Sequence, residues 1–308
     1  MLNISGKSIK NVILFGEALI DVFPDRAVVG GAPLNVARHL RVFGLNPVLI
    51  TRTGNDDYRQ KLIEFMSGFG MSTSAVQCDP HYPTGQVLIE LDQSEHTFEI
   101  LANQAYDFID PAMAKEIASS ASADLVYFGT LAQRNLASRK ALEEILHQTT
   151  QVPAFLDINL RKPWYSPEVV RYSLNQADYV KMNKDELVEL SGMLTMQTRN
   201  IDEIAQRLIE DFRLNSLLVT CGEDGAWLRN SAGAEFKTGS MKKTPIADTV
   251  GAGDGFSAVF ILGILLGWPD TVMLARANEF AAAICGIRGA IPGSATFYAH
   301  FLKDWSLS

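Results

Sequence analysis

The sequence predicts an α/β protein built on a doubly wound, mostly parallel β-sheet with helices on both faces. Two observations support this fold class. Short apolar runs alternate with longer segments of helical character along most of the chain. Several of these runs are apolar without interruption, as expected of strands that are covered on both faces. Ligands of such sheets bind beyond the carboxyl ends of the strands, so functional residues are expected in the loops that follow them.

The expected elements follow one another in chain order. Strands are predicted at 12–16, 48–53, 125–129, 154–158, 179–182 and 216–220. Helices are predicted between them, at 34–43, 57–69, 137–147, 167–175, 184–190 and 201–212. No repeat, low-complexity tract or linker divides the chain, so we expect a single domain over residues 1–308.

Two segments break this alternation. Residues 84–91 and 96–101 are strand-like and flank the polar turn Asp92-Gln93-Ser94-Glu95, which predicts a hairpin without a helix. A second extended piece, 18–29, leaves the core directly after the first strand. We expect the inserts, at about 18–32 and 84–105, to form a small β-sheet lid over the site, because long excursions in compact domains tend to be functional. The alternative is an excursion without a function.

Composition excludes several classes of protein. The chain has 308 residues, 47% hydrophobic and 20% charged, as in a soluble globular protein with a sizeable core. Its net charge of −8 argues against a nucleic-acid or anionic-membrane partner. It contains no apolar run of membrane-spanning length and its first residues are too polar for a signal peptide, so we expect a cytoplasmic protein. The three cysteines, Cys78, Cys221 and Cys285, are expected to be small buried residues in a reducing compartment.

The most informative segment is Asp248-Thr249-Val250-Gly251-Ala252-Gly253-Asp254, which leads into an apolar stretch. Small residues at Gly251, Ala252 and Gly253 let the backbone turn tightly and leave its N–H groups uncovered. If a helix follows, these groups lie at its positive end and form an anion site. Asp254 inside that site suits a base that acts while negative charge develops on a bound phosphoryl group. The alternative is a glycine-rich turn before a buried helix; the spacing fits neither a dinucleotide fingerprint nor a P-loop.

A second candidate site follows the first strand. Gly30 and Gly31 permit close approach to a ligand, and Asn35 belongs to the helix that starts after them. Asp21 precedes them on the same side of the sheet. A carboxylate and an amide in one pocket can hold vicinal hydroxyls, because the carboxylate accepts hydrogen bonds and the amide both donates and accepts. Taken alone, Asp21 and the glycines also fit an ordinary turn.

Three further segments follow later strands. In extended geometry Asp157, Asn159 and Arg161 would emerge together, with Arg161 as a cation for a phosphate or substrate oxygen. The alternative pairs Arg161 with Asp157 in a solvated loop. Asn183 and Glu186 have capping-box spacing, and could also hold water around a hydrated Mg²⁺.

The segment from Thr220 to Gly225 also follows a strand. Its backbone amides, around Gly222 and Gly225, could face a phosphate or nucleotide. Taken alone, the segment is only a turn.

Taken together and in this order, these motifs resemble the ribokinase-like, or PfkB-type, carbohydrate kinases over nearly the whole chain. Within that family, the segment that ends at Asp21, the Gly30 to Asn35 stretch, Asp157 to Arg161 and the hairpin around Phe98 are most similar to fructokinases. The resemblance implies ATP-dependent phosphorylation of a sugar hydroxyl, most closely fructose to fructose 6-phosphate. It further implies a lid that closes over the site and shuts out water. A homodimer formed through that lid is common in such kinases.

The resemblance also implies a role for each candidate residue. Asp254 would be the base, with the amides of Gly251, Ala252 and Gly253 around the transferred phosphoryl group. The residues expected to bind the sugar are Asp21, Gly30, Gly31, Asn35, Phe98 and Arg161. The nucleotide would contact Asn183, Thr220, Gly222, Gly225 and Asn278, with Mg²⁺ near Glu186 through water. In such kinases the segment that corresponds to the tail from Ile287 to Ser294 often shapes a K⁺ site. Here this tail is one residue shorter than the usual pattern, so a K⁺ site involving Asp248 is only an alternative.

Other acceptors and other classes of protein remain alternatives. The same chemistry would serve 2-keto-3-deoxygluconate, ribose or a nucleoside. A regulator that binds sugar without catalysis is a second class, and the intact Asp254 argues against it. A nicotinamide dehydrogenase is disfavoured by the position of the glycine-rich motif.

Overall fold

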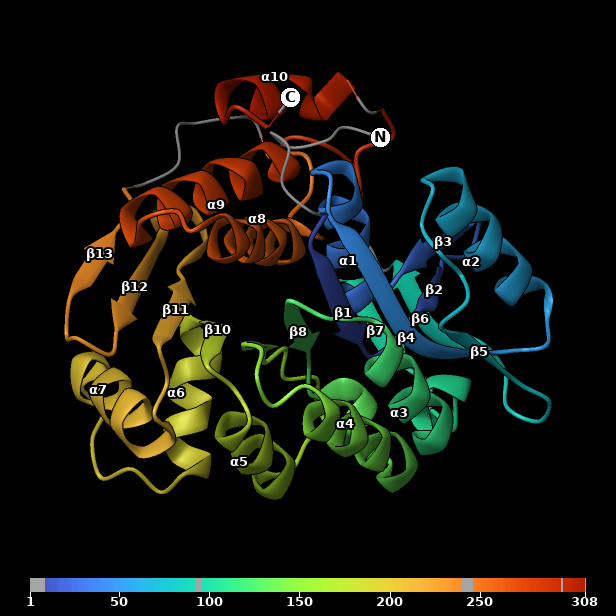
Figure 1. Cartoon of the computed structure of the whole chain (residues 1–308), viewed down its shortest axis with the longest axis horizontal. Helices are drawn as coiled ribbons and strands as arrows, with labels where there is room; N and C mark the ends of the chain where they lie inside the picture. Colours follow the sequence, from blue (N-terminus) through green and yellow to red (C-terminus); the bar gives the residue numbers. More distant parts are fainter. Residues whose placement is uncertain (1–8, 92–95, 240–245, 295, 308) are drawn as a thin grey trace.

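A nine-stranded sheet with helices on both faces forms the body of the protein (Figure 1). The computed structural model describes residues 9–91, 96–239, 246–294 and 296–307. The strand order is β13-β12-β11-β10-β9-β8-β1-β4-β5. The strand β1 (Asn11–Phe15) pairs in parallel with β4 (Asn46–Gly54) on one side and with β8 (Leu125–Phe128) on the other. The predicted doubly wound α/β fold is thereby confirmed.

The remaining strands extend the sheet in both directions from β1. The parallel ones are β5 (Val76–Asp79), β9 (Ala154–Asp157), β10 (Tyr179–Asn183) and β11 (Ser216–Thr220). Two antiparallel strands, β12 (Ala226–Asn230) and β13 (Glu235–Lys237), complete one edge. The chain passes from β1 to β4 and β5 on one side and later to β8 on the other. The carboxyl ends of β1 and β8 therefore form the switch point at which such sheets bind ligands.

Two layers of helices cover the two faces of this sheet (Figure 1). One layer contains α1 (Ala32–Val42), α2 (Asp57–Gly68), α8 (Ala252–Leu266), α9 (Asp270–Cys285) and α10 (Thr296–Asp304). The other contains α3 (Pro111–Ser120), α4 (Leu136–Gln148), α5 (Pro167–Asn175), α6 (Lys184–Met193) and α7 (Ile201–Phe212). Short 3₁₀ turns lie at η1 (Ala105–Phe108), η2 (Leu131–Arg134) and η3 (Gly222–Asp224). Successive residues of β1 alternate between the two layers, as strand geometry requires.

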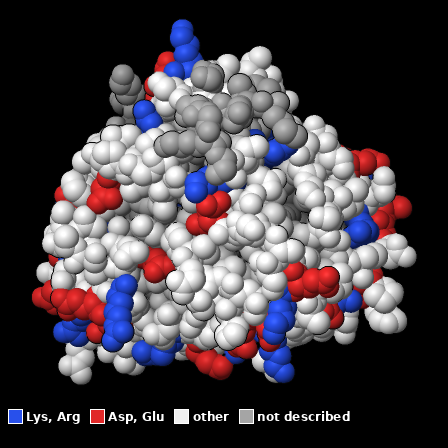
Figure 2. All heavy atoms as spheres, in the orientation of Figure 1, with Lys and Arg blue, Asp and Glu red and all other residues white. Residues whose placement is uncertain are grey.

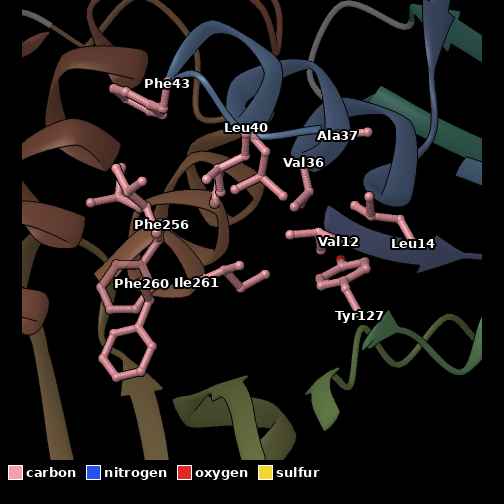
Figure 3. Packing of buried hydrophobic residues seen from close by; sticks show 14 of the residues in the cluster. Val12, Leu14, Val36, Ala37, Leu40, Phe43, Tyr127, Phe256, Phe260 and Ile261 are labelled. Atoms are coloured by element: carbon pink, nitrogen blue, oxygen red, sulfur yellow. The ribbon is translucent and has the colours of Figure 1, made fainter. Parts of the chain in front are cut away.

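Helix α8 is buried at the centre of the first layer. Its residues Phe256 to Gly263 are all buried, so this helix is apolar on every side rather than amphipathic. Figure 3 shows Phe256, Phe260 and Ile261 in one core with Leu40 of α1. This packing fixes the position of the N-terminus of α8 relative to the central strands.

A separate four-stranded sheet has the order β3-β2-β6-β7. Its strands are β2 (Leu19–Val22), β3 (Ala27–Gly30), β6 (Gly85–Leu91) and β7 (His96–Ile100). Strand β2 pairs antiparallel with β3 and parallel with β6, and β6 pairs antiparallel with β7. The predicted small sheet is confirmed, whereas the turn Asp92-Gln93-Ser94-Glu95 lies outside the described residues.

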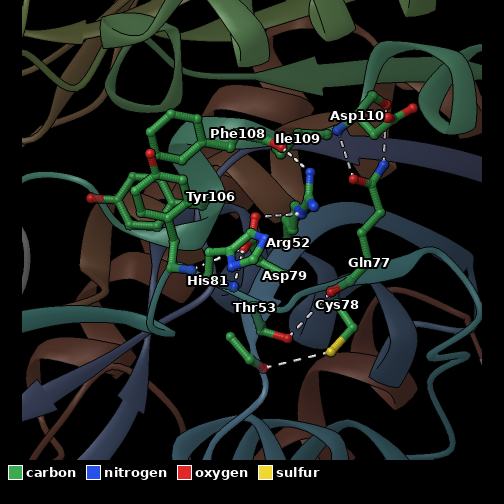
Figure 4. Close-up of polar contacts among 12 residues, drawn as sticks. Arg52, Thr53, Gln77, Cys78, Asp79, His81, Tyr106, Phe108, Ile109 and Asp110 are labelled. Atoms are coloured by element: carbon green, nitrogen blue, oxygen red, sulfur yellow. Dashed lines mark hydrogen bonds and ion pairs between the residues drawn. The ribbon is translucent and has the colours of Figure 1, made fainter.

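A half-buried arginine anchors the segments that enter and leave the β6–β7 pair (Figure 4). Arg52 of β4 places Nε 3.0 Å from Oδ2 of Asp79 and donates from Nη1 to the carbonyl of Phe108 at 2.5 Å. The other oxygen of Asp79 accepts the amides of His81 and Tyr82 at 2.8 and 2.9 Å. Tyr82 in turn stacks on Phe108, with ring centroids 3.8 Å apart. Both ends of this part of the small sheet are thus fixed to the main sheet.

The expectation that all three cysteines are buried is wrong for Cys78, which is exposed. Cys78 lies in β5, the edge strand of the main sheet, and its neighbours Gln77 and Asp79 take the buried side. Because side chains alternate along a strand, Cys78 faces outward. Cys285 is buried and Cys221 is half-buried.

Acidic and basic side chains are interspersed on the face shown in Figure 2 and gather mainly along its rim. In the part of the chain that the structure describes, no helix is both long and apolar enough to cross a membrane.

Candidate active site

The loop before α8 presents unpaired backbone amides at the start of this helix. Gly251 caps the helix with φ +80°, in the left-handed region that favours glycine. Within the described residues, the amides of Gly251, Gly253 and Asp254 have no hydrogen-bond partner, whereas Ala252 N donates to Thr249 O at 3.3 Å. Such amides, at the positive end of a 15-residue helix, form an anion site.

Asp254 lies in the first turn of α8 and is held by Asn35 of α1. Asn35 Nδ2 donates to Oδ2 of Asp254 at 2.8 Å and so joins segments 219 residues apart. Asn35 is buried, and its Oδ1 has no hydrogen-bond partner among the described residues. Because buried amide oxygens almost always accept a hydrogen bond, this atom is suited to accept one from a ligand hydroxyl.

The two glycines before α1 allow the chain to pass close to other groups. A Cβ atom at Gly30 would lie 2.5 Å from Oδ2 of Asp21, so the carboxylate of Asp21 lies directly against Gly30. A Cβ atom at Gly31, where φ is +107°, would lie 2.6 Å from the carbonyl oxygen of Glu17. Asp21 is half-buried, and burial raises its pKa to about 6. Both glycines are therefore required by the close packing of this segment.

The extended geometry predicted for Asp157, Asn159 and Arg161 is wrong. Strand β9 ends at Asp157, and Asn159 adopts φ +41°, which breaks the alternation of side chains. Arg161 is exposed and Asp157 is fully buried, so the two do not pair. Asp157 instead binds Nζ of Lys181 in β10, at 3.0 and 3.2 Å to its two oxygens.

A cleft of about 360 Å³ lies between β7 and the carboxyl ends of β9 and β10. Phe98, Arg161, Asn183 and Glu186 all line it. Asn183 and Glu186 form the expected capping box of α6, with reciprocal bonds of 2.8 Å. The second oxygen of Glu186 accepts the amide of Leu160 at 2.9 Å. Each carboxylate oxygen thus already holds one amide and keeps one further acceptor position, which is enough for a water ligand of a hydrated ion.

A larger cleft of about 1040 Å³ lies between β13 and α9, and Asn278 is among its lining residues. Gly225 adjoins the cleft, because a Cβ atom there would lie 2.6 Å from the carbonyl of the lining residue Gly239. Gly222 and Gly225 both have positive φ, +59° and +90°, in the tight turn after β11. Thr220 ends β11 beside Asn183 in the parallel register.

Asp248 ties the loop before α8 to the tail of the chain. Its Oδ1 accepts the amide of Val250 and its Oδ2 that of Gly289, both at 3.0 Å. In the described ranges no three His, Cys, Asp or Glu side chains converge as a metal site.

The family model described as "pfkB family carbohydrate kinase" matches residues 10–296 of the chain. The chain belongs to this family. It is therefore a phosphotransferase that acts on a carbohydrate-type acceptor.

Curated relatives of this kinase cover nearly its whole length at low identity. It is 26% identical to a probable fructokinase-5 of Arabidopsis thaliana over 92% of this chain and 94% of the relative. It is 26% identical to a fructokinase of Klebsiella pneumoniae, over 89% and 91% of the two chains. The aminoimidazole riboside kinase of Salmonella typhimurium is also 26% identical, over 91% and 89%.

Solved structures confirm the ribokinase-like fold of this kinase. A sugar kinase of Pyrococcus horikoshii has a TM-score of 0.83 at 24% identity, covering 97% of this chain and 100% of that one. A fructokinase of Xylella fastidiosa with bound ATP has a TM-score of 0.81 at 19% identity, covering 96% and 99%. A fructokinase of Vibrio cholerae with fructose, ADP and potassium has a TM-score of 0.78 at 24% identity, covering 95% and 98%.

Besides Asp21, two further carboxyl groups in the site of this kinase have pKa values raised toward neutrality. Burial raises the pKa of Asp254 to about 6, while the hydrogen bond from Asn35 opposes this rise. Burial also raises the pKa of Glu17, to about 7, although Arg161 lowers it. Glu17 lies two residues after the end of β1 and is buried. Several carboxyl groups with pKa values near neutrality in one site are typical of acid–base chemistry.

Sequence reasoning missed Glu17 and Lys181. The lysine between Val180 and Met182, in the middle of an apolar strand, could have indicated a site residue, because a buried lysine is rarely found without a charged partner. Burial alone would lower the pKa of Lys181, but Asp157 and Glu186 outweigh it and raise that pKa. Glu17 carried no comparable signal, since an acid after a strand is common.

Proposed function

We propose that this kinase is a fructokinase, transferring the γ-phosphoryl group of ATP to the 6-hydroxyl of D-fructose with Asp254 as the base. The observation that carries the proposal is the 2.8 Å bond between Asn35 and Asp254. It joins the segment expected to bind the sugar to the unpaired amides at the start of α8. The fructokinases among the relatives favour fructose over other acceptors.

In the proposed reaction, Asp254 takes the proton from the attacking hydroxyl. The hydroxyl oxygen forms a bond to the γ-phosphorus while the bond to the β–γ bridging oxygen breaks, and ADP leaves. The amides of Gly251 and Gly253 would hold the developing negative charge, which is the largest contribution a protein makes to such a transfer. Asp21 and the free Oδ1 of Asn35 would bind neighbouring sugar hydroxyls and hold the acceptor in line.

We assign the nucleotide to the cleft of about 1040 Å³, whose size suits a purine nucleoside. Asn278 would contact the base, and the turn containing Gly222 and Gly225 would face the phosphates. Glu186, with one acceptor position left on each oxygen, fits Mg²⁺ through water. Mg²⁺ when bound neutralises phosphate charge and orients the transferred group.

The test is a coupled assay of ADP release with about a dozen acceptors, including fructose, ribose, 2-keto-3-deoxygluconate, fructoselysine and aminoimidazole riboside. We expect kcat/KM to be highest for fructose and the product to carry its phosphate on oxygen 6. Preference for a riboside would replace fructose as the acceptor but leave the chemistry in place. Absence of ADP release with every acceptor would contradict the proposal as a whole.

We expect kcat/KM to rise with pH through a midpoint near 6 and to stay level above it. A base acts in its ionised form, and the pKa of Asp254 is raised from 3.8 to about 6. Below the midpoint, kcat/KM should fall about tenfold per pH unit, as expected for one essential proton. Initial rates at subsaturating fructose between pH 5 and 8 measure this profile. A level profile over that range would rule out Asp254 as the base.

A further inference from the structure

A buried ion pair lies beneath the start of α8. Lys181 and Asp157 face each other in the β9–β10 register, with side chains 6% and 0% exposed. Oδ2 of Asp157 also accepts a hydrogen bond from Ser257 Oγ of α8 at 2.8 Å. Apolar neighbours in both strands mean that this pair costs desolvation energy that a hydrophobic pair would not. Such a pair is better explained by an electrostatic role in the site than by stability.

The lysine ammonium reaches the anion site from below. A Cβ atom at Gly253 would lie 2.9 Å from Lys181 Nζ, so the ammonium lies directly under the turn that carries the unpaired amides. Nζ lies 3.0 and 3.2 Å from the two oxygens of Asp157, and this single carboxylate engages one of the three N–H directions of the ammonium. The ammonium thus lies against Gly253, while the carboxylate of Asp157 accepts from Ser257 of the same helix.

We propose that Lys181 is a positioning residue for phosphoryl transfer, whose ammonium, held by Asp157, adds positive charge beneath Gly253 and favours the ionised form of Asp254. The inference rests on the proposed function and adds to it a charge that no motif of the sequence indicates. Asp157 has the complementary role, because it holds the ammonium and offsets part of its charge.

The charged and titratable groups around Asp254 come from several elements. Asn35 of α1 donates to it directly. The other groups that interact with it electrostatically are Asp157 of β9, Arg161 after β9, Lys181 of β10, Glu17 after β1 and Tyr127 of β8. Asp157 raises the pKa of Asp254 and Lys181 lowers it. Removing Lys181 should therefore raise the pKa of Asp254, and removing Asp157 should lower it.

The experiment compares Lys181→Met, Asp157→Asn and the double variant with the wild-type kinase, using Lys140→Met, an exposed lysine of α4, as control. For Lys181→Met we expect kcat to fall about 10- to 100-fold, somewhat less than the loss of one direct donor to a transition state. We expect the pH midpoint of kcat/KM to move up in Lys181→Met and to move down in Asp157→Asn. The double variant should return the midpoint close to that of the wild type while kcat stays low.

Two further measurements distinguish the loss of this role from misfolding of a variant. The double variant contains no unpaired buried charge, so it should fold even where Lys181→Met does not. The acidity of Asp254 can also be measured without turnover, from the pH dependence of unfolding relative to the matching Asp254→Asn background. Folded variants with unchanged kcat and midpoint would overturn the role of Lys181. Failure of the wild-type kinase to phosphorylate any acceptor would instead contradict the proposed function.

Discussion

Replacing Asp254 by asparagine is expected to lower kcat by about 10²- to 10⁴-fold, the range for a positioned general base. Asparagine has the same shape and can still accept the hydrogen bond from Asn35, so the affinities for ATP and fructose should change little. The measurement is kcat from steady-state rates, together with the two dissociation constants from calorimetry. The equally conservative Asp211→Asn, on the exposed face of α7, should leave all three quantities unchanged.

The same variant has an expected effect on stability that separates a misfolded protein from a missing base. The pKa of Asp254 is higher in the folded protein, about 6, than its ordinary value of 3.8. Protonation therefore stabilises the folded state at low pH, and this contribution is lost as pH rises through 6. Above that pH, Asp254→Asn should unfold at a higher temperature than the wild type. An inactive variant that is also less stable at pH 8, or one that turns over like the wild type, would contradict this assignment.

The elements that sequence analysis placed best have strong local signals at both ends. Helices α5 and α7 run over the predicted residues, 167–175 and 201–212. Ser166 caps α5 before a proline, and Asn200 caps the start of α7, whose end is capped by Arg213 in the left-handed region. These are local interactions between neighbours in sequence, so the sequence alone can specify them.

The elements that were not predicted depend on tertiary contacts. Strands β12 and β13 are short and have few buried residues, with no apolar run longer than Ala226–Leu228, because they form the antiparallel edge of the sheet. Helices α9 and α10 bury aromatic residues around Phe280 and Tyr298, whose packing onto α1 is set by the whole layer. Short or mixed patterns of this kind do not distinguish a strand from a loop or a buried helix.

In the candidate site, too, the features set by local sequence were predicted and those set by tertiary contacts were not. The residues before α8 were recognised because a tight turn needs glycine at fixed positions, which the sequence shows directly. The partner of Asp157 was not recognised, because Lys181 becomes its neighbour only through the pairing of β9 with β10. Local alternation placed Arg161 on the same side as Asp157 and Asn159, since it assumed that the strand continues beyond Asp157.

Replacing Gly251 by alanine is expected to reduce kcat by at least about 10²-fold, the cost of losing a donor to a developing anion. The residue has φ +80°, and an added Cβ would lie 2.4 Å from Cα of Ala290 and 2.7 Å from its carbonyl oxygen. These atoms are backbone, so the turn itself must move and its amides lose their alignment. At Gly253 an added Cβ would instead lie 2.9 Å from Nζ of Lys181, so Gly253→Ala should lower kcat by displacing the ammonium rather than the backbone of the turn.

Gly267, the C-cap at the other end of α8, provides a matched control for this variant. It has a similar φ of +69°, and no atom would lie within 4 Å of a Cβ added there. Gly267→Ala should therefore cost about 1 kcal/mol of stability through backbone strain alone and leave kcat unchanged. Melting temperatures and kcat of both variants separate strain from loss of the anion site. Equal losses of kcat in the two variants, or full activity of Gly251→Ala, would show that the amides at the start of α8 do not hold the transferred group.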